Sequence, residues 1–371
     1  MSEETEDTKP SADILSKAGK SLGSSAVSHE KLGEVILTSE NSEIGKVLLT
    51  YDQDPKEISR IIASEARENP FYTQLMSSTL DCDRFDYLLR DSKMAGVSYG
   101  LVDLEYILQN LRWHEHEKRV CFHEKAIHAL EHFITARFYH YNIIHHKAVM
   151  GFELMAKALF YAMMKWPKFD PKIPYEIVRT FDDITEKVKN DASFLANFTD
   201  EYFWFYLDRW IPYDDFCGRL RESLLNRDPL HLIAEERVLY SDSQEPNLAK
   251  YNYFKKTLLT DPKFEKILKC EDVAIESLTI TERKIKFEEI PSTLEYSEVD
   301  RVHDEDLLKL VKIFRGQDRK LDDLIGEKSS IIHLLSKYET RLVRVYGLVE
   351  KKKRKTIDIA ASELASEFAN Y

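Results

Sequence analysis

The residue types best suited to chemistry gather in one stretch of the sequence, residues 79–100. Within it, Asp83, Tyr87 and Asp91 are spaced four residues apart, so on a helix they share one face, with Arg84 beside them. A carboxylate can bind a hard cation, a guanidinium can bind phosphate, and a carboxylate with a phenol can hold a sugar hydroxyl. The spacing indicates a helix that presents a polar binding site. The alternative is an amphipathic surface helix whose charges are solvated.

The same helix needs a second face that packs against the protein. Phe85, Leu88 and Leu89 lie largely on another side from the polar residues, so they can enter a hydrophobic core. Asp86 and Arg90 are four residues apart and are typical of a solvated surface pair. We therefore expect a helix whose apolar face is buried and whose polar face is held in a fixed place.

Local signals place other elements around this helix. Asp54 followed by Pro55 predicts a helix start, because proline suits the first helical turn. Gly96 and Gly100 suit the loop that follows the polar helix. The longest helical signal runs over residues 114–165, and its methionines are expected to fill the core.

The run LDCDRFDYLLRDSKMAGVSYGLVDLEYIL resembles the second metal-site segment of the HD-domain phosphohydrolases. More narrowly, it is similar to the branch that includes the deoxynucleoside triphosphate triphosphohydrolases. In that family, the pattern D-x-D-[RK]-x-D-Y-x-x-R-D supplies a metal-binding Asp, a phosphate contact, and a Tyr and an Asp near the sugar. The resemblance implies that Asp83 binds a divalent metal (Mn, Mg, Fe or Zn), that Arg84 contacts phosphate, and that Tyr87 and Asp91 lie near the sugar.

A second segment that resembles this family is ARFYHYNIIHHKAV, which is similar to the pattern A-R-Y-x-M-Y…V-Y-x-H-K. The Arg, Tyr and His of that pattern line the nucleotide pocket, so the resemblance assigns Arg137 and Tyr141 to substrate binding. The chain is one residue shorter before the final H-K pair, so either His145 or His146 corresponds to the family histidine.

The pair His29–Glu30 matches an HE pair that the family places near its reaction centre. The resemblance implies that these two residues are catalytic and assist proton transfer. For a single histidine at a helix start, the alternative is helix capping or surface exposure.

His128 and His132 form an H-x-x-E-H pattern, in which two histidines four residues apart can share a zinc ion. The same stretch resembles the A-x-E-H-F-x-x-A-R-Y helix of the phosphohydrolase family, which holds no zinc there. We therefore prefer the family helix to a zinc peptidase site here.

The metal site implied by the resemblance is incomplete in this sequence. The HD motif consists of a His, an adjacent His-Asp pair and a distant Asp, but no histidine precedes His29. The adjacent pair His303–Asp304 lies far downstream and is expected to be the solvated start of a helix. One Asp is too few ligands for tight metal binding. We expect a truncated version of a longer enzyme or a decayed site, with very weak turnover or none.

Composition restricts the class of protein. The net charge of −12 argues against broad nucleic-acid binding, which requires a basic surface. The four cysteines are scattered and form no CxxC pair, which fits a reducing cytoplasm. No apolar run approaches the roughly 20 residues that a membrane span requires. We expect a cytoplasmic protein that binds a nucleotide and no membrane, and a homo-oligomer is compatible with the sequence.

The expected fold is mainly α, a helical HD-type domain followed by a smaller α+β region. Residues 1–27 are expected to be a flexible leader, residues 28–235 the almost wholly helical domain, and residues 236–371 the α+β region with all the strands. Its expected elements are three strands, VAIESLTI, RKIKFEEI and RLVRVYGLV, and two helices, DEDLLKLVKIF and TIDIAASELASEFAN. The run KKKRK is expected to be solvated.

Two functions remain open from the sequence. The first is a metal-dependent phosphohydrolase that acts on a nucleotide, with a deoxynucleoside triphosphate as the implied substrate. The second is a catalytically dead nucleotide-binding or scaffolding subunit with the same fold.

Overall fold

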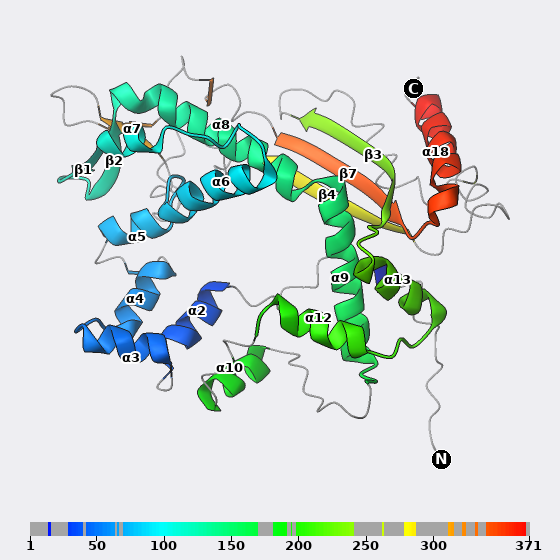
Figure 1. Cartoon of the computed structure of the whole chain (residues 1–371). Coiled ribbons are helices and arrows are strands. Elements are labelled where there is room, and N and C mark those ends of the chain that lie inside the picture. The colour runs from blue at the N-terminus through cyan, green and yellow to red at the C-terminus, as the bar shows by residue number, and fades with distance from the viewer. Residues whose placement is uncertain are drawn as a thin grey trace.

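The computed structural model describes residues 14–15, 29–39, 42–63, 65–66, 70–169, 181–190, 194, 198–240, 262, 278–286, 311–314, 321–323, 331–332 and 339–368. The described chain is mainly helical and has two small sheets, as expected (Figure 1). None of the described helices has both the length and the apolar character needed to cross a membrane.

Short helices precede the polar helix in the described part of the chain, among them α2 (His29–Thr38), α3 (Glu43–Thr50), α4 (Pro55–Ile62) and α5 (Pro70–Met76). The start of α4 is the one predicted from the sequence. The Asp54 side chain accepts a hydrogen bond from the Lys56 amide at 2.9 Å, and Pro55 occupies the first turn.

The polar helix is α6 (Cys82–Ala95), and both of its ends have strong local signals. The Asp81 side chain accepts a hydrogen bond from the Arg84 amide at 2.8 Å, and Gly96 ends the helix in the left-handed conformation with φ of 70°. Phe85 and Leu88 are buried, as the pattern predicted. The short helix α7 (Leu104–Gln109) follows.

After α7, the chain forms a β-hairpin that the sequence analysis did not predict. Strands β1 (Leu111–His114) and β2 (Arg119–His123) pair antiparallel, and β2 also pairs in parallel with β5 (Lys312–Phe314). Strand β6 (Leu321–Asp323) completes this four-stranded sheet. The expectation that residues 28–235 contain no sheet is therefore wrong.

The expected helix at residues 304–314 is also wrong at its C-terminal end, because residues 312–314 form strand β5. Residues 304–310, and with them His303–Asp304, lie outside the described residues. The apolar side chains of Val311 and Ile313 are 5% and 1% exposed and belong to the core around α6 and α8. Pairing with a distant strand has overridden the local helical pattern.

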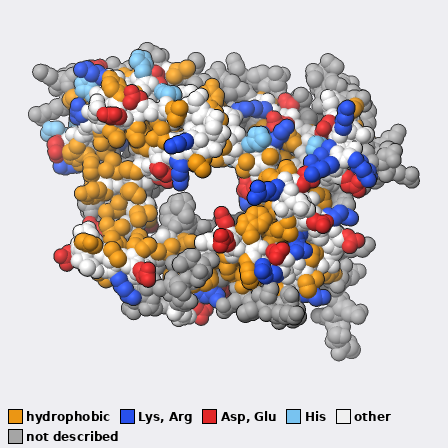
Figure 2. Space-filling view, in the orientation of Figure 1, with side chains coloured by type: hydrophobic (Ala, Val, Ile, Leu, Met, Phe, Trp, Pro, Cys, Tyr) orange, Lys and Arg blue, Asp and Glu red, His pale blue; other side chains and the backbone are white. Residues whose placement is uncertain are grey.

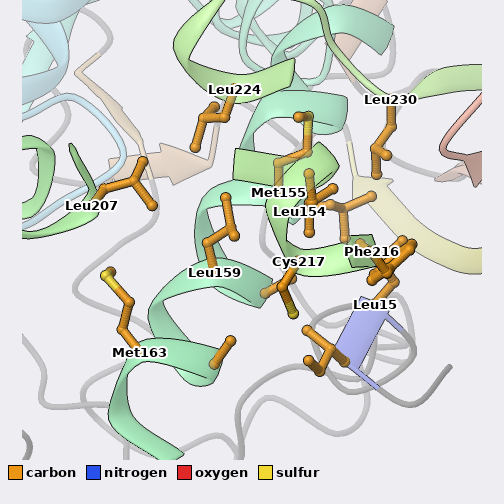
Figure 3. Packing of buried hydrophobic residues seen from close by; sticks show 14 of the residues in the cluster. Leu15, Leu154, Met155, Leu159, Met163, Leu207, Phe216, Cys217, Leu224 and Leu230 are labelled. Carbon is orange, nitrogen blue, oxygen red and sulfur yellow. The ribbon is translucent and has the colours of Figure 1, made fainter. Parts of the chain in front are cut away.

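Two long helices follow the hairpin, α8 (Ile127–Ile144) and α9 (Lys147–Lys165). Helix α8 packs on α6, and the rings of Phe133 and Phe85 lie 4.6 Å apart. Helix α9 enters a second core with α12 (Asp200–Arg209) and α13 (Asp215–Leu225) (Figure 3). Met155 and Met163 are fully buried there, which confirms their expected packing role.

Two residues of the expected flexible leader, Ile14 and Leu15, lie in this second core with 1% and 0% of their surface exposed. Their side chains contribute apolar contacts next to α9 and α13, and Leu15 lies near Phe216 in Figure 3. At these two positions, the leader is a buried part of the fold. The described helix α10 (Phe181–Asn190) lies between α9 and α12 in the sequence.

The second sheet has the order β3 (His231–Tyr240), β7 (Glu339–Gly347) and β4 (Leu278–Lys286), with antiparallel pairing. Strand β7 confirms the expected strand RLVRVYGLV. The other two expected strands are wrong in their division, because β4 is one strand that runs across both segments. Strand β3 begins at residue 231 and so crosses the expected domain boundary. The chain ends in η5 (Lys351–Lys353) and the expected helix α18 (Arg354–Phe368).

The surface of the N-terminal helices is unusually apolar. Figure 2 shows hydrophobic side chains gathered at the left of the view, over the region of α4 and α5. Large apolar residues that are at least 40% exposed occur on α3 and α5: Ile44, Val47, Leu49, Tyr72 and Met76. Assembly into a homo-oligomer stays a prediction that this surface is compatible with.

Candidate functional site

The candidate site lies where α6 faces α8, and its best-defined contact is between Asp91 and His140. Nε2 of His140 lies 3.0 Å from Oδ2 of Asp91. The Tyr87 ring lies 4.9 Å from the His140 ring at an angle of 38°. Tyr87 and Asp91 are one turn apart on α6, and both contact α8 through His140, whereas Asp83 on the same face is exposed.

Arg137 and Tyr141 lie one turn apart on α8, next to this contact. Burial raises the pKa of the Tyr87 phenol, and the positive charges of Arg137 and Arg84 oppose that rise. The Tyr141 phenol is close enough to raise the same pKa slightly. The charges of α8 thus act on Tyr87, and Asp91 contacts α8 through His140. Their roles in binding stay predictions.

His145 and His146 are neighbours at the corner between α8 and α9 but make different contacts. The His145 ring stacks on the Tyr141 ring, with centroids 5.6 Å apart and an interplanar angle of 6°. The His146 ring instead caps α9, since its Nδ1 accepts a hydrogen bond from the Ala148 amide at 3.3 Å. Of the two histidines, His145 is therefore the one whose ring contacts a predicted site residue.

Arg84 is engaged in local structure at the start of α6. Its guanidinium donates to the buried Asp81 carboxylate and to the Ser78 carbonyl. Burial raises the pKa of Asp81, and the Arg84 charge opposes that rise. Arg84 therefore stabilises a buried carboxylate, and any contact with phosphate would have to share the guanidinium with Asp81.

The described donors do not fit a divalent metal. Asp83 is exposed on the first turn of α6, and the nearby Asp81 carboxylate is occupied by Arg84. Throughout the described ranges, no three His, Cys, Asp or Glu side chains come together in a way that could hold a metal ion. The helix α2 begins at the expected catalytic pair His29–Glu30, but the side chains of that pair lie outside the described part of the chain.

The H-x-x-E-H pattern also behaves as helix surface. His128 is 95% exposed in its side chain, and its Nδ1 lies 3.0 Å from Oε2 of Glu131. His132 is exposed on the next turn of α8. Both histidines of the pattern are therefore surface residues of α8.

His140 is the site residue that sequence reasoning missed. It occupies the place of the Met in the pattern A-R-Y-x-M-Y, and this substitution was the available signal. Its partner Asp91 lies 49 residues earlier, so the contact could not be inferred from spacing on one helix.

Two cavities lie elsewhere, along α13. One, of about 700 Å³, is lined by residues such as Tyr213, Arg219 and Glu222. The other, of about 500 Å³, lies between α13 and η5 and includes Asp228 and Lys351. Asp228 is held there by a salt bridge to Arg354, with Nη1 and Oδ1 3.0 Å apart. Neither cavity includes a residue of the predicted site.

Comparison with known proteins gives short sequence matches. No protein-family model matches the chain. The uncharacterized protein MG461 of Mycoplasma genitalium is 33% identical over 122 residues, which is 32% of this chain and 28% of that protein. The uncharacterized protein YwfO of Bacillus subtilis is 34% identical over 114 residues, 30% of this chain and 25% of that protein. The chain therefore spans about a quarter of the length of these curated relatives.

Comparison with solved structures gives matches over most of the chain at low sequence identity. A hypothetical protein from Aquifex aeolicus matches with a TM-score of 0.58 and 17% identity, over 95% of this chain and 75% of that one. A phosphohydrolase from Bacteroides thetaiotaomicron matches with a TM-score of 0.49 and 17% identity, over 91% of this chain and 85% of that one. The likeness to the Aquifex protein is one of fold.

Proposed function

We propose that this chain binds a nucleotide, of the deoxynucleoside triphosphate class, between α6 and α8, and that it carries the nucleotide-binding part of an HD-type phosphohydrolase. The observation that supports this proposal is the contact of Tyr87 and Asp91 on α6 with His140 on α8, the helix that also carries Arg137 and Tyr141. Helical spacing selects Tyr87 and Asp91, and the family resemblance selects these two together with Arg137 and Tyr141.

The chemistry of these residues suits the parts of a nucleotide. Arg137 is 8% exposed as a residue, so its guanidinium would interact with phosphate in an environment that water screens poorly. The Asp91 carboxylate would accept a hydrogen bond from a sugar hydroxyl, and the aromatic rings of Tyr87 and Tyr141 would offer apolar surface to the sugar or base.

Binding of the nucleotide does not require the metal site, whereas its hydrolysis does. Asp83 is the single metal ligand that the resemblance assigns, and one exposed carboxylate holds a divalent cation weakly. We therefore expect hydrolysis by the 371-residue chain to be very slow. This observation favours the second candidate function, a nucleotide-binding subunit without catalytic activity of its own.

The test is calorimetric binding of dATP to the full chain and to Asp91→Asn and Arg137→Gln variants. Loss of a charge-assisted contact of about 1.5–3 kcal/mol should weaken binding by about 10- to 100-fold in each variant. Lys118→Gln is the control, since Lys118 lies in the turn between β1 and β2 and is 64% exposed. Thermal unfolding of each variant checks that it is folded.

A phosphate-release assay with dATP and manganese separates the two candidate functions. Turnover that is abolished by Asp83→Ala would show that this chain assembles a working metal site, against the non-catalytic alternative. Unchanged dATP affinity in both the Asp91 and the Arg137 variants would contradict the proposed binding site.

A further inference from the structure

His140 is buried between the two helices of the site, and its surroundings define what it can do. It is 6% exposed, whereas the Asp91 side chain, with which it makes a hydrogen bond, is 38% exposed. The contact joins Nε2 to Oδ2 at 3.0 Å, within normal hydrogen-bond range. The Asp91 carboxylate therefore has one oxygen held from the inside, while part of the group faces outward.

The second oxygen of Asp91 is held much less firmly. Its Oδ1 lies 3.7 Å from Nε of Arg90, which exceeds hydrogen-bond distance. The Arg90 side chain is 59% exposed, so this ion pair is screened by water and weak. Oδ1 can therefore accept a hydrogen bond from a ligand while His140 keeps the carboxylate from rotating.

A carboxylate accepts, so His140 must carry a proton on Nε2 to make this bond. The Tyr87 ring, 4.9 Å away, packs against the imidazole and restricts its orientation. One hydrogen bond and one ring contact thus fix the imidazole, and the imidazole fixes the carboxylate. His140 therefore acts as a supporting residue that holds Asp91 in a fixed orientation for binding.

We propose that His140 is a positioning residue that determines sugar specificity, because it orients Asp91 to accept the 3′-hydroxyl of a bound deoxynucleotide. This inference rests on the proposed function, since it assumes that a nucleotide occupies the site. A 2′-deoxynucleoside 5′-triphosphate has one free sugar hydroxyl, at C3′. Because dATP and 2′,3′-dideoxy-ATP differ only in this hydroxyl, the difference in their affinities measures how strongly the site binds it.

Two substitutions separate the hydrogen bond from the packing of the side chain. His140→Met replaces the imidazole with an unbranched side chain of similar size and so removes the N–H donor. His140→Gln retains an N–H donor at the end of the side chain. A residue that only fills space would tolerate both changes equally, whereas a positioning residue distinguishes between them.

The experiment measures the ratio of the dATP and dideoxy-ATP dissociation constants for the full chain and both variants. We expect His140→Met to lower the preference for dATP by about fivefold to tenfold, as the loss of one hydrogen bond of about 1 kcal/mol or slightly more would do. His140→Gln should restore most of the preference. Because the ratio compares two ligands on the same sample, it is insensitive to the fraction of folded protein.

His128→Met is the matched control, because His128 also pairs with a carboxylate on α8 but is 95% exposed. It should leave the ratio unchanged. An unchanged ratio in His140→Met, or an equal loss of affinity for both ligands, would overturn the role of His140 while leaving nucleotide binding intact. If the wild-type chain binds neither ligand, the proposed function itself is wrong and this inference is overturned with it.

Discussion

Gly100 lies where the chain returns across α6, and the space there admits no side chain. A Cβ atom at this position would lie 1.8 Å from the Ser92 hydroxyl oxygen and 2.6 Å from the Leu88 carbonyl oxygen. Ser92 and Leu88 are both fully buried, so neither can move aside easily. The glycine therefore permits the close approach that places the end of α6.

We predict that Gly100→Ala lowers the free energy of unfolding by about 1–3 kcal/mol, the usual cost of overpacking. Urea denaturation of the full chain measures this change. Gly33→Ala is the control, because a Cβ there meets nothing within 4 Å and the position lies inside α2. That variant should be neutral or slightly more stable. Equal stability of Gly100→Ala and the wild type would disprove the close packing.

The site residues that could be predicted from the sequence are those defined by their spacing on a single helix. Tyr87 and Asp91 share a face of α6 because the helical repeat places them there, whatever the rest of the fold. His140 escaped prediction because a histidine on a long apolar helix is ordinarily a packing residue. Its significance comes from Asp91 on another helix, and that contact depends on how α6 and α8 pack.

At the scale of elements, strand β7 holds the corner between α8 and α9. The Tyr346 hydroxyl donates to the Lys147 carbonyl at 3.1 Å, and the Arg344 guanidinium donates to the His145 carbonyl. The two residues are two apart, so they project from the same face of the strand. The C-terminal sheet thereby fixes the corner that carries the ring stacked on Tyr141.

We predict that Tyr346→Phe speeds amide hydrogen exchange at the start of α9 and lowers stability by about 1 kcal/mol, since it removes one hydrogen bond. Burial raises the pKa of Tyr346 to about 12, so the hydroxyl stays protonated and the effect should be constant between pH 6 and pH 9.

Tyr72→Phe is the control, because Tyr72 is 57% exposed on α5. Exchange at the start of α9 should not change in that variant. If Tyr346→Phe leaves this exchange unaltered, the strand does not hold the corner.

The elements predicted correctly are those with local causes. Helix α4 begins at Asp54 and Pro55, and α6 ends at Gly96, because caps and proline act within one turn. The hairpin β1–β2 was missed because its turn is charged and contains no glycine. Its second strand, β2, also pairs with β5, and no local pattern predicts a partner strand so far away in the sequence.

At the scale of the whole molecule, the C-terminal region is part of the core around the candidate site. Ile313 of β5 is 1% exposed and lies in the same hydrophobic cluster as Leu88 of α6 and Phe133 of α8. The helices that carry the site therefore depend on residues that the sequence assigned to another region.

We predict that Ile313→Ala destabilises the full chain by about 2–5 kcal/mol, the cost of a large-to-small change in a core. Ile331→Ala is the matched control, since Ile331 is 52% exposed, and it should change stability by less than about 0.5 kcal/mol. Thermal or urea unfolding gives both values. Equal effects of the two substitutions would mean that β5 is not a structural part of this core.

The parallel pairing of β2 with β5 also sets an order of events during synthesis. Phe122 lies beside Ile313, so the strand that completes the sheet leaves the ribosome long after the hairpin it joins. Until then, the hairpin has an open edge and the apolar surface under α8 lacks part of its cover. Contacts between residues so far apart in sequence form slowly, and the nascent chain is exposed to aggregation during this interval. We therefore expect a chain that ends before β5 to aggregate more readily than the full chain.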